Sequence, residues 1–166
     1  SNSEAVKGGV NMTNAATTFL KYAQVQVAAE ALFGLQFQSP GTKFYGDVDV
    51  TTLTEGNMHS SRFTADEAAR FVKDWTVVEH ISNTTTGFSG TLFRAKVDDP
   101  SVGIKAGELV LSFRSTEFID DAARDNQATN AMEIKPFGWA FGQLSDMKHW
   151  VDSLYASGKI NPASNL

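Results

Sequence analysis

One short segment constrains the fold more than any other. Leu109 to Phe113 reads LVLSF and is almost continuously apolar, which is typical of a strand covered on both faces. The segment ends abruptly in Arg114-Ser-Thr-Glu117, and the sequence turns helical from Ile119. A buried strand followed at once by a helix N-terminus brings backbone N–H groups and a helix dipole to the edge of a sheet. Open α/β sheets bind their ligands at such edges.

The rest of the chain divides into helical and extended segments. Ala-rich helical spacing predicts a helix over Thr13–Phe33, and a capping box, Thr64-x-x-Glu67, predicts a helix from Ala65 to about Lys73. The thirty or so residues from Gly34 onwards read as loop with room for one short strand. Strands are predicted at Trp75–Ile81 and Phe88–Val97, and they pair as an antiparallel hairpin across the turn Asn83–Gly87. A loop follows at Asp98–Gly107. The last prediction is a helix from about Ala140 to Ser157, which ends at Gly158.

The order of these segments predicts the fold class. With 166 residues, the chain has the usual size of one domain. Strands that come first and are followed by strand-helix alternation predict an α/β fold. We expect the antiparallel hairpin at the edge of the sheet, beside a parallel core in which Leu109–Phe113 is a central strand between flanking helices.

Composition excludes several classes of function. The net charge is −5 and Lys and Arg do not cluster, which argues against a nucleic-acid partner. The absence of Cys removes disulfides, thiol nucleophiles and thiolate metal sites. No window approaches the ~20 apolar residues of a transmembrane segment, and no signal-peptide layout is present.

The polar end of the apolar strand carries a family resemblance. Phe113-Arg-Ser-Thr-Glu117, followed by Asp125, resembles the Phe-Arg-Gly-(Thr/Ser) segment of the class 3 lipases, in the α/β-hydrolase superfamily. The resemblance implies that Thr116 stabilises the oxyanion and that Asp125 lies on the helix that braces this loop. Ser115 stands where that family usually has Gly. From its charge, we expect Arg114 to anchor the loop by pairing with Asp121 or Asp125.

Further segments extend the resemblance over residues 64–166, which it implies are the N-terminal half of a lipase-like α/β-hydrolase domain. Gly87-Phe-Ser-Gly90 and Gly138-Trp-Ala-Phe-Gly-Gln143 resemble segments of the same lipases, whereas Ala122 stands near where they often have Trp. Residues 1–63 form a helical, loop-rich N-terminal region of the same structural domain. No Gly-x-Ser-x-Gly elbow is present, so we expect a fragment that ends before the nucleophile and is inactive alone.

The resemblance also implies what the parent protein does. It would hydrolyse carboxylic esters, with a lipid or ester as substrate and without a cofactor or metal, through a serine activated by His and an acid. The resemblance leans towards a bacterial secreted protein. An unpaired flank on the last strand would favour self-association through an exposed sheet edge.

Other motifs have simpler interpretations. His59, His80 and His149 are expected to be surface or structural histidines, and Ser145-x-x-Lys148 a chance match. Asp47-Val-Asp49 and Asp120-Asp121 read as solvated acids, since neither has the further ligands of a Ca²⁺ site. Core packing is favoured for Phe137, Trp139 and Phe141 over an acyl-binding groove. The alternative for Thr116 is a helix N-cap, and the alternative function is a non-catalytic α+β binding or interaction module.

Overall fold

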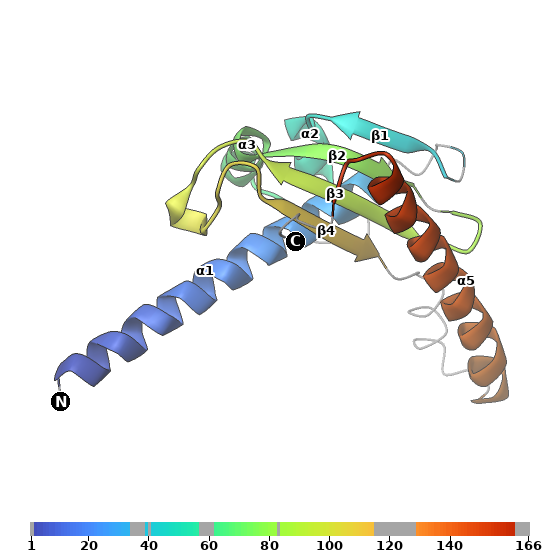
Figure 1. The fold of residues 1–166 in the computed structure, drawn as a ribbon, viewed down its shortest axis with the longest axis horizontal. Helices are drawn as coiled ribbons and strands as arrows, with labels where there is room; N and C mark the ends of the chain where they lie inside the picture. The colour runs from blue at the N-terminus through green and yellow to red at the C-terminus, as the bar shows by residue number, and fades with distance from the viewer. Residues whose placement is uncertain are drawn as a thin grey trace.

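The protein, seen in a computed structural model, combines helices with a four-stranded antiparallel sheet (Figure 1). The structure describes residues 2–33, 39, 41–56, 62–82, 84–114 and 129–161, with side chains from residue 15 in the first helix and from residue 142 in the last. The mixed α and β composition expected from the order of segments is therefore confirmed.

The sheet has the simplest possible strand order. Each described strand pairs antiparallel with the next one along the chain, so the order in space is also the order in sequence. The strands are β1 (Lys43–Gly46), β2 (Trp75–Ile81), β3 (Ser89–Ala95) and β4 (Leu109–Arg114).

Two expectations about this sheet were wrong for the described strands. The β2–β3 hairpin is confirmed, but it lies in the middle of the sheet because β1, in the segment read mainly as loop, pairs with its outer side. No two described strands are parallel, and β4 lies at an edge instead of the centre. Its apolar character has another cause: α1 covers one face of β4 and α5 the other. Coverage of two faces does not require a partner strand on both edges.

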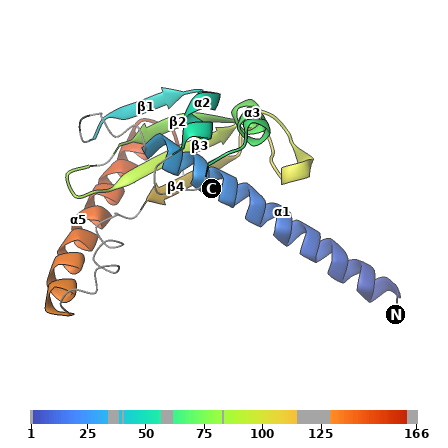
Figure 2. The same cartoon turned by 180° about the vertical axis from the view of Figure 1, so that it is seen from behind.

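The helix α1 (Asn2–Phe33) covers one face of the sheet with its C-terminal half. Alanines at positions 28 and 31 are almost fully buried, which lets the helix backbone approach the sheet closely. Lys21 is also buried and forms an ion pair with Glu108, at 2.6 Å, just before β4. The N-terminal part of α1 extends past the sheet (Figures 1 and 2).

Two shorter helices complete this side of the core. The helix α2 (Val50–Glu55) begins at Asp49, whose side chain accepts a hydrogen bond from Thr51 N. The helix α3 (Ala65–Asp74) begins at the predicted cap, where Thr64 accepts from Glu67 N. The largest side chains of this core are Leu32, Leu53, Phe63, Phe71, Trp75 and Phe93.

The helix α5 (Thr129–Ala156) covers the opposite face. Its described C-terminal part packs Trp150 and Leu154 against Phe88 and Leu92 of the hairpin. Gly158, with φ of +75°, follows the helix in a conformation that favours glycine, which confirms the predicted stop. Two helix-covered faces make β3 a buried strand on both sides.

The strands β3 and β4 are joined through a loop with a short 3₁₀ helix, η1 (Pro100–Val102), capped by Asp99.

Among the helices in the described residues, none is both long enough and apolar enough to cross a membrane.

Candidate functional site

The end of β4 is where the predicted oxyanion loop begins. Arg114 closes the strand opposite Ser89 of β3. Ser115, Thr116 and Asp125 lie outside the described residues, as does the side chain of Arg114. The role predicted for these residues therefore stays a prediction, and the structure defines only the surroundings of the strand end.

An aromatic cluster holds this end of β4. The ring of Phe113, 40% exposed, lies 6.2 Å from that of Trp150 and 5.9 Å from that of Phe88. Trp150 lies directly on Gly90, where an added Cβ would come within 2.5 Å of the indole ring. The small residues of the segment Gly87–Thr91 thus serve strand packing, as predicted, because a side chain at position 90 would displace the Trp150 ring from the sheet.

A hydroxyl–carboxylate cluster fastens α5 to the same end of the sheet. Thr84 and Thr86, in the turn between β2 and β3, both donate hydrogen bonds to Asp146 Oδ2, at 2.6 and 2.5 Å. Gln143 donates to the carbonyl of Thr86, and Gly142 lets α5 approach that threonine closely. These contacts hold the part of α5 that begins at Gly142 against the turn between β2 and β3. That turn leads into Ser89, which pairs with Arg114 at the end of β4.

A buried carboxylate joins the other end of α5 to β2. The register shift between Val77 and Glu79 turns both Val78 and Glu79 towards α5. Glu79 is 1% exposed and accepts hydrogen bonds from Trp150 Nε1 at 2.6 Å and Lys159 Nζ at 2.5 Å. Burial alone would raise the pKa of Glu79, but these two hydrogen bonds together with the positive charges of Lys43 and Lys159 outweigh it and hold the pKa below its usual value.

A row of polar side chains crosses the opposite face, under α1. His80, Thr91 and Ser112 are register partners on β2, β3 and β4, and all are buried. His80 Nδ1 lies 2.7 Å from Thr91 Oγ1, while Nε2 has no hydrogen-bond partner within the described residues. Ser112 donates to Gln26 of α1. Burial lowers the pKa of His80 to about 4, so the ring is neutral at pH 7.

This row lacks the features of a catalytic serine and base. The hydroxyl of Ser112 is committed to Gln26 at 2.8 Å, and the ring of His80 is bonded to a threonine. Both groups are buried, with Ser112 only 6% exposed beneath α1 and His80 fully buried. His80 is therefore a structural histidine, as predicted. His149 is exposed on α5, and His59 lies outside the described residues.

The remaining sequence motifs have structural roles where they are described. Lys148 pairs with Asp152 on the exposed side of α5, at 2.9 Å, which agrees with a chance Ser-x-x-Lys match. Asp47 pairs with Lys96 and Asp49 caps α2. No group of three or more His, Asp or Glu side chains that could hold a metal occurs in the described part of the chain. Asp120, Asp121 and the side chains of Phe137, Trp139 and Phe141 lie outside it.

The clusters around Glu79 and Asp146 were not predicted from the sequence. A signal for Glu79 was present, since a carboxylate inside the apolar strand WTVVEHI must find partners when it is buried. Its partners on α5 follow only from the packing of that helix. Nothing in the sequence connects Asp146 with the distant threonines of the turn.

The chain was compared with protein-family models, with curated proteins and with solved structures. No family model, curated protein or solved structure matches it.

Proposed function

We propose that this chain supplies the oxyanion strand and loop of a lipase-like serine hydrolase that acts on carboxylic esters, with lipid esters as the substrate class. The observation that carries the proposal is the position of β4. This strand lies at an edge of the described sheet, ends at Phe113-Arg114 beside α5, and leads directly into Ser115-Thr116. The arrangement would form part of an α/β-hydrolase-like fold, with a further strand beside β4.

The hydrogen-bonding phase of β4 supports a further strand at this edge. Ala95 N donates to Glu108 O and Ala95 O accepts from Gly107 N, so the carbonyl of Glu108 points towards β3 at the start of the β3–β4 ladder. Hydrogen-bonded pairs alternate along an antiparallel ladder. The backbone N–H and C=O groups of Leu109, Leu111 and Phe113 therefore point away from β3. A following strand that carries the nucleophile would find these groups ready to pair.

In the proposed reaction, this chain supplies the oxyanion donors and the residues that hold them, and not the nucleophile. A serine on a neighbouring strand, activated by His and an acid, would attack the ester carbonyl. The carbonyl oxygen then gains negative charge, which the backbone N–H and hydroxyl of Thr116 would stabilise. Arg114 and Asp125 would hold the loop in place. The packing of Trp150 and the hydrogen bonds of Asp146 would fix the position of α5 relative to β4 beside that loop.

A second function has one observation in its favour. All pairs among the described strands are antiparallel, which also suits a self-contained α+β binding or interaction module. Such a module needs no nucleophile, and Thr116 would then be only a helix N-cap.

Substitution of Thr116 in a chain extended downstream of Leu166 tests the proposal. Ester hydrolysis by that extended protein is expected to lose roughly 10²-fold to 10³-fold in kcat in Thr116→Ala, the cost of one oxyanion donor. Thr116→Ser keeps the hydroxyl and is the matched control, which should retain most activity. An extended protein without esterase activity, or a Thr116→Ala variant with unchanged kcat, would favour the interaction module.

A further inference from the structure

The two edges of the described sheet differ in how they are protected. β1 is short, carries Lys43, and has a register shift between Phe44 and Gly46. Short length, charge and irregularity are the usual means by which natural proteins prevent edge pairing. β4 has none of these: its register with β3 is regular from Leu109 to Arg114, and it is uncharged before that last residue. Among the residues that the structure describes, the β4 edge is therefore open to pairing, whereas the β1 edge is protected.

The outward-facing groups of β4 have a symmetry of their own. Leu109, Leu111 and Phe113 present their backbone N–H and C=O groups away from β3, and this set is symmetric about Leu111. Two antiparallel copies of such a strand satisfy each other when Leu111 faces Leu111 and Leu109 faces Phe113. A two-fold axis through that position makes one surface complementary to itself.

The side chains at this edge suit the same pairing. Phe113 is 40% exposed, and Leu109 and Leu111 are half-buried on the face covered by α5. Across a two-fold axis, each leucine would meet an apolar side chain of the other copy. No like charges would be placed opposite each other over Leu109–Phe113.

We propose that two copies of this 166-residue chain pair antiparallel along β4, as a two-fold symmetric dimer centred on Leu111. This inference goes beyond the proposed hydrolase and does not depend on it. In a longer chain, a following strand would compete with the second copy for the same edge. Failure of the dimer would leave the Thr116 experiment unaffected.

Sedimentation equilibrium of the purified chain, from low micromolar to several hundred micromolar, tests the dimer. The average mass is expected to rise towards two copies with concentration. Phe113→Lys would place a charge at the paired edge, and dimerisation should weaken by about tenfold or more. Leu144→Lys makes the same type of change at an exposed α5 position and should dimerise like the unsubstituted chain. A chain that stays monomeric at all concentrations would overturn the proposal.

Hydrogen exchange of the unsubstituted chain locates the interface even if Phe113→Lys fails to fold. The amides of Val110 and Ser112 point towards β3 and should be protected at every concentration. The amides of Leu109, Leu111 and Phe113 should gain protection only as the dimer forms. A dimer in which these three amides exchange as fast as in the monomer would show an interface elsewhere and refute the β4 pairing.

Discussion

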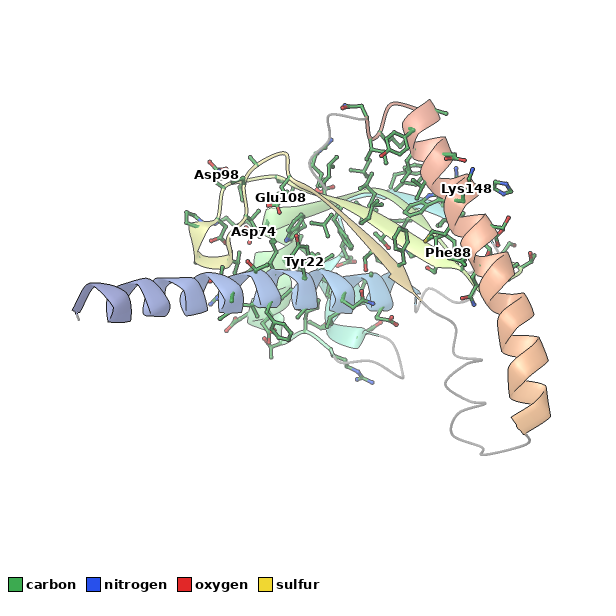
Figure 3. The ribbon with its side chains drawn as sticks, turned by 60° about the horizontal axis from the view of Figure 1, so that its bottom comes forward. Tyr22, Asp74, Phe88, Asp98, Glu108 and Lys148 are labelled. Atoms are coloured by element: carbon green, nitrogen blue, oxygen red, sulfur yellow. The ribbon has the colours of Figure 1, made fainter. Side chains whose placement is uncertain are left out.

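Replacement of Asp74 by Asn should change how the stability of this protein depends on pH. Asp74 is 6% exposed at the end of α3, and it shares a hydrogen bond with Asp99 of the neighbouring loop. Burial, followed by the hydrogen bond and the charge of Asp99, raises the pKa of Asp74 from 3.8 to about 6. Figure 3 shows Asp74 and Asp98 at the loop end of the sheet, opposite Phe88. Asn is close in shape and can still donate to Asp99.

The sign of the effect follows from the raised pKa. The folded protein binds the Asp74 proton more tightly than the unfolded chain, so this group favours folding fully below pH 3.8 and loses that contribution as pH rises through 6. The interval from 3.8 to about 6 corresponds to about 3 kcal/mol at most, at 1.36 kcal/mol per pKa unit. Asp74→Asn should therefore be more stable than the unsubstituted protein at pH 8, by up to that amount.

His80 acts in the opposite direction over a similar range. Its pKa is lowered from 6.5 to about 4, so the neutral ring favours folding above pH 6.5, and the contribution disappears as pH falls through 4. This interval is also worth about 3 kcal/mol. In the unsubstituted protein the two groups largely offset each other. In Asp74→Asn the contribution of Asp74 is absent and no longer offsets that of His80, so stability should fall steeply between pH 6.5 and 4.5.

Urea denaturation followed by tryptophan fluorescence measures this directly, since Trp75 and Trp150 are both buried. The free energy of unfolding is compared at several pH values between 4.5 and 8. An Asp74→Asn variant that is less stable than the unsubstituted protein at pH 8, or a difference that does not change with pH, would refute the reasoning.

Three other results are expected. Gly90→Ala should destabilise the fold by about 1–3 kcal/mol because its Cβ would overlap the Trp150 ring; urea denaturation should show a smaller cost in a Trp150→Leu background, and an equal cost would refute the contact. Glu79→Gln should cost about 2 kcal/mol by removing the charged acceptor of Lys159, whereas Lys148→Gln, which breaks an exposed pair, should cost under about 0.5 kcal/mol; similar costs would contradict the role of burial. The 166-residue chain alone should not turn over a short-chain nitrophenyl ester, and saturable hydrolysis by it would contradict the expected absence of a nucleophile.

Local signals in this sequence predicted local structure well. The Thr64 capping box, the run WTVVEHI and Gly158 each act through neighbouring backbone groups or side chains, and the structure places a helix start, a strand and a helix end at those positions. Such signals depend on a few adjacent residues, so they predict local structure correctly even when the tertiary fold is not known.

The errors concerned relations between distant segments. A continuous apolar run shows that both faces of β4 are covered, but it does not distinguish coverage by helices from a central position among strands. β1 is the short strand for which the loop reading left room, but its pairing with β2 and the helix α2 that follows it were not predicted, because turn signals dominate this segment rich in glycine and hydroxyl side chains. The partners of Glu79 are 71 and 80 residues away and those of Asp146 are 62 and 60 residues away, and no periodicity carries that information.

Sequencing the source gene downstream of the codon for Leu166 tests the proposed hydrolase most directly. The proposal predicts a strand followed by Gly-x-Ser-x-Gly within about ten residues, which would pair beside β4 and bring the nucleophile next to Thr116. A stop codon, or a continuation without that elbow, would contradict the hydrolase and leave the chain as an interaction module.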